Sequence, residues 1–316
     1  MLSTLALALL VAAPKLPSPA FVTIGDAELK GYQAVWALSD VHGSMSALTG
    51  LLSNAKLAAA SGGSLKWNVA ASKQLVIAVG DYMNGGPDSV AVVLALRDLQ
   101  GQAKAAGSKL LVLLGNQEAE LLSDPEKETT PEVLKSARPF ASQLGLGDKV
   151  KPKELAKSAF GDYLRTLPAG AMVGRTLFIH SGDLDEKGPY KAAEKFAARD
   201  QDAYASLLGD GSLIGSHNWW KKADRFAKVK DRWAKVGVSA LVIGHDPDAL
   251  GAMGQAAQSR DGWLIKLDAG IKDGLSKGRI VRCPPAAIST GALLDGGKPV
   301  CTQLADKGSP APLPLK

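Results

Sequence analysis

The 316-residue chain has few residues of several informative types: two cysteines, four histidines and 5% aromatic residues. Neither Cys283 nor Cys301 lies near a histidine in the sequence, so we expect no thiolate metal site. In an exported protein the two cysteines could form a disulfide that fixes the C-terminal segment, and two unpaired thiols are equally compatible with the sequence. The net charge is +6, but no block of Lys and Arg and no basic–aromatic repeat occurs. We therefore expect no nucleic-acid partner.

Long hydrophobic runs are also missing, which excludes an integral membrane segment. The run from Leu5 to Ala13 has the length of a signal-peptide core, and prolines and small residues follow it as far as Ala20. We interpret residues 1–20 as a signal peptide and expect a periplasmic or secreted protein. The alternative is the irregular N-terminus of a cytosolic protein.

What is abundant is an alternation of strand-like and helix-like patterns. Ala-rich segments at 44–60 and 87–106 carry apolar residues at helical spacing, and apolar runs flank them. The predicted strands are 33–38, 74–79, 109–114, 175–179, 240–243 and 263–267. Repeated β-α-β units favour a sheet whose inner strands are parallel and covered by helices. The fold class is therefore predicted to be α/β.

The remaining segments suggest how the chain is organised. We expect one main domain at 21–285, and no internal repeat is visible. The composition changes at 123–160, which we interpret as a helical insertion that could cover a site. Residues 286–316 are rich in Pro and Gly, so we expect a loosely ordered tail. We expect a monomer.

Residue types that bind metals recur where the predicted strands end. The six positions are Asp40, His42, Asp81, Asn116, His180 and His245. Each alone is more typical of a turn or of a core histidine, but ligands of such sheets gather beyond the carboxyl ends of the strands. Mixed oxygen and imidazole ligands suit two divalent ions, and Mn, Fe and Zn all fit. Two such ions about 3.5–4 Å apart clamp phosphoryl oxygens and acidify water. The pattern therefore predicts a dinuclear site for phosphate-ester hydrolysis.

The segments that carry these residues resemble the calcineurin-like metallophosphoesterases, and within them the phosphoprotein-phosphatase branch with its bacterial, Shewanella-like members. The matching stretches are Ser39-Asp-Val-His-Gly43, Gly80-Asp-Tyr-Met-Asn-Gly-Gly-Pro-Asp-Ser89, Leu113-Leu-Gly-Asn-Gln-Glu118, Phe178-Ile-His-Ser-Gly182 and Val242-Ile-Gly-His-Asp-Pro247. The resemblance covers about residues 33 to 285. It implies a layered β-sandwich flanked by helices.

The resemblance also implies a role for each of the six ligand positions. Asp40 and His42 would bind the first metal, and Asp81 would bridge both. The second metal would be completed by Asn116, His180 and His245.

Several positions depart from the family pattern. Gly85 stands where the family has an arginine that grips phosphate as a bidentate fork, and Asn84 stands where it has an aspartate. Gln117 replaces the histidine that protonates the leaving group, a contribution of about 10²–10⁴-fold in such enzymes. Lys221 or Lys222 would stand in for a second phosphate-gripping arginine.

We therefore assign catalytic positions to Asn116, Gln117 and Asp81, and substrate binding to Lys221, Lys222 and Asn84. The predicted function is a dinuclear-metal phosphoesterase that uses metal-bound hydroxide, slowly or with altered specificity, on a phosphorylated small molecule or phosphoprotein. The alternative is a pseudophosphatase that retains the metals and binds a phosphorylated ligand or partner. For His217, which lies outside the motifs, we expect a surface or helix-cap role, with a displaced acid as the alternative.

Overall fold

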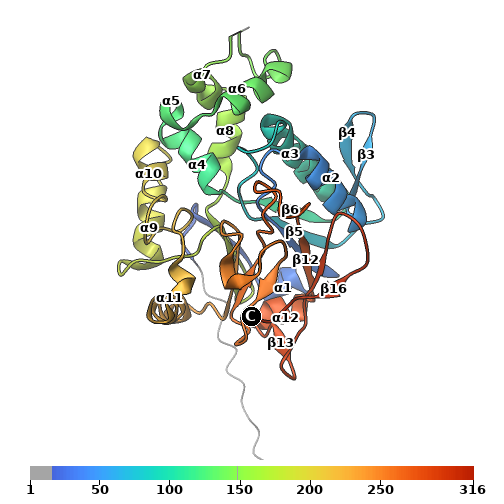
Figure 1. Cartoon of the computed structure of the whole chain (residues 1–316), viewed down its shortest axis with the longest axis vertical. Coiled ribbons are helices and arrows are strands. Elements are labelled where there is room, and N and C mark those ends of the chain that lie inside the picture. Colours follow the sequence, from blue (N-terminus) through green and yellow to red (C-terminus); the bar gives the residue numbers. More distant parts are fainter. Residues whose placement is uncertain (1–15, 148) are drawn as a thin grey trace, which may run out of the picture.

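Two six-stranded sheets form the centre of the protein in the computed structural model, which describes residues 16–147 and 149–316 (Figure 1). In spatial order, the first sheet contains β1 (Phe21–Ile24), β7 (Gly170–Val173), β8 (Thr176–Ile179), β9 (Ala240–Ile243), β11 (Leu264–Lys266) and β10 (Ala257–Gln258). The second contains β16 (Ala311–Pro312), β15 (Thr302–Leu304), β12 (Ile280–Cys283), β2 (Ala34–Leu38), β5 (Gln74–Ala78) and β6 (Lys109–Val112). Two small hairpins are β3 (Ala58–Ser61) with β4 (Ser64–Trp67), and β13 (Leu294–Asp295) with β14 (Lys298–Pro299).

Side chains alternate between the two faces of each sheet. On β2, Val35 and Ala37 belong to an apolar cluster that also contains Ala240 and Val242 of β9, so this cluster lies between the two sheets. Ala34, Trp36 and Leu38, on the other face of β2, instead pack among the helices. The architecture is thus a β-sandwich with helices on its outer faces, as predicted.

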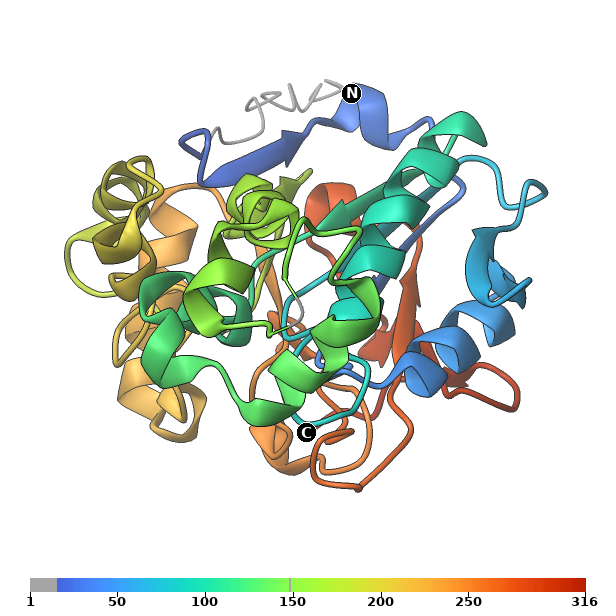
Figure 2. The same cartoon turned by 90° about the horizontal axis from the view of Figure 1, so that it is seen from above.

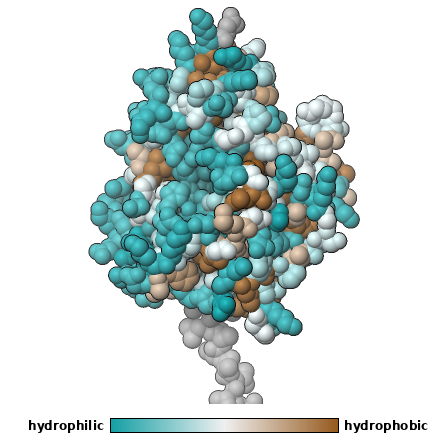
Figure 3. Space-filling view, viewed as in Figure 1, coloured by the Kyte–Doolittle hydropathy of each residue, from teal (hydrophilic) through white to brown (hydrophobic). Residues whose placement is uncertain are grey.

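Helices cover both outer faces and one end of the sandwich. They are α1 (Asp26–Leu29), α2 (Met45–Asn54), α3 (Ser89–Ala105), α4 (Asn116–Ser123), α5 (Pro125–Glu128), α6 (Pro131–Ala137), α7 (Pro152–Lys157), α8 (Ala159–Thr166), α9 (Gly188–Phe196), α10 (Gln201–Ala205), α11 (Ala223–Lys235) and α12 (Pro285–Thr290). Short 3₁₀ turns are η1 (Arg138–Phe140), η2 (Trp219–Lys221) and η3 (Ala249–Gly251). Helices α4 to α8 gather at the top of Figure 1 and face the viewer in Figure 2, so the segment 123–160 is helical as expected. On the face seen in Figure 3, hydrophilic residues predominate.

All six predicted strands are present. Strands β2, β5 and β6 are parallel to one another, and so are β8, β9 and β11. The prediction of parallel inner strands holds only for these strands, because the inner strands β12 and β15 pair antiparallel, and β7 pairs antiparallel with β8. The helix expected at 44–60 is too long, because α2 ends at Asn54. Lys56 then adopts a positive φ of 59°, and the chain enters the β3–β4 hairpin. A left-handed residue cannot continue a right-handed helix, which explains the break.

The expectation of a loosely ordered C-terminal segment is wrong. Strand β15 pairs with β12, and β16 pairs with β15, so the segment extends the second sheet. A disulfide joins Cys283 to Cys301 and ties the segment to β12. Pro and Gly content alone missed this backbone pairing, because edge strands tolerate proline.

The predicted signal peptide lies mainly at residues 1–15, outside the described residues. Leu16 and Ala20, at its predicted end, are buried. None of the described helices is long and apolar enough to cross a membrane.

Candidate metal centre

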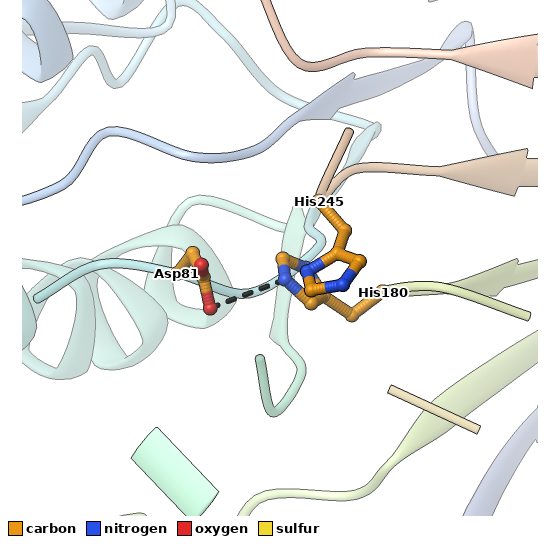
Figure 4. A group of neighbouring side chains, drawn as sticks. All are labelled: Asp81, His180 and His245. Atoms are coloured by element: carbon orange, nitrogen blue, oxygen red, sulfur yellow. Dashed lines mark ion pairs between the residues drawn. The ribbon is translucent and has the colours of Figure 1, made fainter. Parts of the chain in front are cut away.

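The six predicted ligands converge where the carboxyl ends of strands from both sheets meet. We call these residues the inner cluster: Asp40, His42, Asp81, Asn116, His180 and His245, all buried. Donor atoms of Asp81, His180 and His245 lie within 4.8 Å of one another (Figure 4), and those of Asp40, His42 and Asp81 form a second such group. Asp81 belongs to both groups and is the residue that they share.

The distances place Asp81 between two imidazoles. Its Oδ1 lies 3.1 Å from Nε2 of His180, and its Oδ2 lies 3.7 Å from Nε2 of His42. Nε2 of His42 is also 3.8 Å from Oδ1 of Asp40. Asn116 directs its Oδ1 to His180 Nε2 at 3.1 Å and to His245 Nδ1 at 3.0 Å. Each carboxylate oxygen of Asp81 therefore faces a different imidazole.

Backbone carbonyls fix the orientation of two of these imidazoles. Nδ1 of His42 lies 2.8 Å from the Asn84 carbonyl oxygen, and Nδ1 of His180 lies 2.7 Å from that of Val79. A carbonyl only accepts, so both Nδ1 atoms carry a proton, and each Nε2 remains for the carboxylates or for a cation. Nε2 of His245 is buried without a hydrogen-bond partner among the described residues. This donor set fits divalent transition metals, which would also satisfy that nitrogen.

The backbone is strained where it presents the inner cluster. Positive φ angles occur at Asp40 (55°), His42 (42°), Asp81 (56°) and His245 (72°). Asp and His tolerate this region better than most residues, but it still costs energy. Strain of this kind persists where the surrounding structure enforces it, typically at functional sites.

Two glycines allow the close approach of the strand ends. A Cβ atom at Gly115 would lie 2.2 Å from Oδ1 of Asp81, and one at Gly244 would lie 2.3 Å from Oδ2 of Asp40. Any larger residue would displace a carboxylate of the inner cluster. These glycines are therefore required by packing against the ligands.

Glu118 has a structural role that the motif did not reveal. Its buried carboxylate accepts hydrogen bonds from the backbone N–H groups of Asp81 (3.0 Å), Tyr82 (2.9 Å) and Gly115 (2.9 Å). Glu118 thus joins the ends of β5 and β6 and fixes the loop that carries Asp81. Sequence spacing could not show this, because two of its partners follow a different strand.

Opposite charges stabilise each other inside the cluster. Burial works against a charged His180, but Asp81 and Asp40 outweigh burial and raise the pKa of His180 to about 10. Burial also works against a charged Asp81, yet His180 holds the pKa of this carboxyl below its usual value. Without cations, a protonated His180 therefore offsets the carboxylates. A bound cation would take over this role and displace the proton.

A pocket of about 350 Å³ opens onto the inner cluster. We call five residues at or beside this pocket the rim: Asn84, Gly85, Gln117, His217 and Lys272. Gln117, His217 and Lys272 line the pocket, whereas Gly85 lines an adjoining pocket and Asn84 bonds Gln117. Asn84 Nδ2 donates to Gln117 Oε1 (2.6 Å), and Thr130 Oγ1 donates to Asn84 Oδ1 (2.9 Å). In this series of hydrogen bonds from Thr130 to Gln117, the side-chain amide N–H groups of Gln117 have no acceptor among the described residues.

Lys221 and Lys222, expected to bind substrate, do not line this pocket. Lys221 Nζ bonds Asp248 Oδ2 at 2.8 Å, and Lys222 lines a neighbouring cavity of about 790 Å³ beside the Asp183–Arg225 ion pair. Lys221 ends η2 and Lys222 follows it, and both are exposed, so the expected contact with substrate in this pocket is not supported. A different lysine lines the pocket, and no motif in the sequence indicates it.

That lysine is Lys272, in the loop between β11 and β12. His217 also lines the pocket, and its exposed side chain agrees with the expected surface position. Its ring stacks on His245 with centroids 3.8 Å apart, and its Nδ1 lies 2.8 Å from Asp246 Oδ1. Asp246 in turn accepts a hydrogen bond from Trp220 Nε1 at 2.8 Å. These contacts fix the His217 ring beside His245 at the pocket.

The family model for calcineurin-like phosphoesterases matches residues 34–249, which include all six residues of the inner cluster. The chain belongs to the calcineurin-like phosphoesterase family. It is accordingly assigned to the metal-dependent phosphoric ester hydrolases. No curated protein matches the chain.

Solved structures support the same fold. A cold-active protein-tyrosine phosphatase of a psychrophilic Shewanella species superposes with a TM-score of 0.67 at 19% identity, over 93% of this chain and 82% of that one. A protein serine/threonine phosphatase of Saccharomyces cerevisiae gives 0.51 at 14% identity, over 85% and 78%. At these identities, the likeness shows a shared fold.

Proposed function

We propose that this calcineurin-like phosphoesterase hydrolyses phosphate esters or anhydrides with two divalent cations held by the inner cluster. The observation that carries the proposal is the arrangement of His42 and His180. Each has its Nδ1 bound to a backbone carbonyl, so each Nε2 faces the shared carboxylate of Asp81. When bound, two such cations neutralise phosphoryl charge and lower the pKa of water.

The protein residues then divide the remaining work. Asp81 and Asn116 orient the site from opposite sides, and the amide N–H groups of Gln117 can donate a hydrogen bond to a phosphoryl or leaving oxygen. An amide cannot transfer a proton at neutral pH. We therefore infer substrates whose leaving group departs without protonation, such as aryl phosphates, acyl phosphates and phosphoanhydrides.

A second candidate is a pseudophosphatase that holds the cations and binds a phosphorylated ligand without turnover. The Thr130–Asn84–Gln117 chain favours it, because a pair of amides stands where the resemblance places an imidazole and a carboxylate. The same pocket would then recognise a phosphate group and release it unchanged.

Hydrolysis assays on matched substrates distinguish the two candidates. With Mn²⁺ present, we expect measurable hydrolysis of p-nitrophenyl phosphate. We expect an alkyl phosphate to be hydrolysed more slowly, by a factor larger than the difference between the two leaving groups alone would give. The control is Asp81→Asn, which keeps the shape of the side chain and removes the bridging charge. Wild-type turnover of p-nitrophenyl phosphate no faster than that of Asp81→Asn, with inorganic phosphate still bound, would favour the pseudophosphatase.

We also propose an exported protein, in the periplasm or secreted. The apolar N-terminal run supports this, as does the Cys283–Cys301 disulfide, because disulfides persist in oxidising compartments. N-terminal sequencing of the mature protein from its native host tests it. An intact N-terminus in a cytosolic fraction would contradict the proposal.

A further inference from the structure

Phosphate binding needs a cation at the rim, and the predicted arginine position holds Gly85. Lys272 is the one Lys or Arg among the described residues that line the 350 Å³ pocket on the inner cluster. It also lines the adjoining pocket of about 290 Å³, together with His42 and Gly85. Its side chain therefore lies at the boundary between the two pockets.

Lys272 occupies the space that a side chain at position 85 would need. A Cβ atom at Gly85 would lie 3.0 Å from Cγ and 3.5 Å from Cδ of Lys272. The φ of Gly85 is +116°, a value that residues with a side chain rarely adopt. The glycine thus leaves room for the lysine stem, and a long side chain at 85 could not share that room with it.

The loop that carries Lys272 is held at both sides of this residue. Leu275 N donates to Gly270 O (2.9 Å), Ser276 Oγ donates to Ala269 O (2.7 Å), and Ile271 packs against the main apolar core. Lys272 itself is exposed, and no ion pair or hydrogen bond engages its ammonium among the described residues. Lys221, by contrast, is paired with Asp248. The loop therefore presents an uncommitted positive charge at the pocket.

We propose that Lys272 is the phosphate-binding cation of this site, reaching across Gly85 from the β11–β12 loop. It supplies charge as a compact ammonium without the planar fork of an arginine, and it neutralises a phosphoryl oxygen that the cations leave exposed. The proposal rests on the proposed function, because it requires a phosphoryl group in the pocket.

Isothermal titration of the Mn²⁺-loaded protein with inorganic phosphate tests the proposal apart from turnover. Lys272→Met is expected to weaken phosphate binding by about ten- to hundredfold, the worth of one charge-assisted hydrogen bond. Lys272→Arg should restore most of the affinity. The matched control is Lys277→Met, on the same loop, because Lys277 lines only the adjoining pocket.

Kinetics add a second readout with p-nitrophenyl phosphate. We expect KM to rise in Lys272→Met with the same fold-change, and the melting temperature to stay unchanged because the side chain is exposed. If the wild type neither binds phosphate nor turns over, the proposed function itself fails. If the wild type binds phosphate and Lys272→Met binds it equally well, the assignment of Lys272 alone is overturned.

Discussion

The inner cluster and the rim lie side by side, each with residues that line the same pocket, but they differ in how they are built. The inner cluster is buried, its imidazoles are fixed by backbone carbonyls, and its residues match the family pattern at all six positions. The rim is more exposed and differs from the pattern at Asn84, Gly85 and Gln117. If the proposed function holds, cation binding would depend on the inner cluster and contact with the substrate on the rim.

The largest expected effect comes from the inner cluster. Asp81→Asn should lower the hydrolysis of p-nitrophenyl phosphate by at least about a thousandfold, because the bridging charge contributes several kcal/mol through the cations. The matched control is Asp248→Asn, which removes a surface carboxylate paired with Lys221 outside the pocket. Equal losses in both variants would show that general charge, and not the bridging position, matters.

The next largest effect should be a gain in hydrolysis from substitutions at the rim. Gln117→His combined with Asn84→Asp rebuilds an imidazole held by a carboxylate, because the two side chains already bond each other at 2.6 Å. Hydrolysis of an alkyl phosphate should rise by about 10²-fold or more, with little change for p-nitrophenyl phosphate. Gly85→Arg is not a suitable partner, since its Cβ would collide with Lys272 at a strained φ. An equal change in the rates of hydrolysis of both substrates would contradict the interpretation that the wild type lacks a proton donor.

A smaller effect is expected where the two regions meet. Glu120 Oε1 accepts a hydrogen bond from Asn116 Nδ2 at 2.9 Å, and the Asn116 oxygen then faces His180 and His245. Glu120→Ala should weaken Mn²⁺ binding by about tenfold, as measured by competition with a chelating dye. Glu126→Ala, an exposed carboxylate of the insertion, is the control. Unaltered Mn²⁺ affinity in Glu120→Ala would mean that Asn116 needs no external orientation.

The smallest effect should come from Thr130, which orients the Asn84–Gln117 pair. Thr130→Val removes the hydrogen bond to Asn84 and the cap of α6, and should slow p-nitrophenyl phosphate hydrolysis about fivefold or less. Thr130→Ser keeps the hydroxyl that also caps α6 and should behave as the wild type. A loss as large as that of Asp81→Asn would contradict the separation of the two regions.

Much of the fold and of the inner cluster could be predicted from the sequence. The strands that carry ligands were located by their apolar runs, and ligand residue types at strand ends identified the inner cluster, because parallel strands deliver their carboxyl ends to one edge. Within the motifs, the changes at Gly85 and Gln117 were visible directly. The inner cluster was predictable because each ligand lies next to the strand that positions it.

The rim was less predictable because its residues come from loops. Lys272 belongs to no motif, and its contact with Gly85 depends on the path of the β11–β12 loop. His217 reaches the pocket because Trp220 and Asn218 hold Asp246, contacts that sequence spacing does not encode. Lys221 and Lys222 were misplaced, because they lie at and just after the end of the short turn η2 and are exposed outside this pocket.

Metal content measured by inductively coupled plasma mass spectrometry tests the central comparison most directly. After loading with Mn²⁺ and removal of free metal, the wild type, Lys272→Met and the Gln117→His, Asn84→Asp variant should each hold about two ions per chain. Asp81→Asn should hold about one or fewer. Less than one ion in the wild type, or loss of metal from the rim variants, would contradict an inner cluster that binds cations independently of the rim.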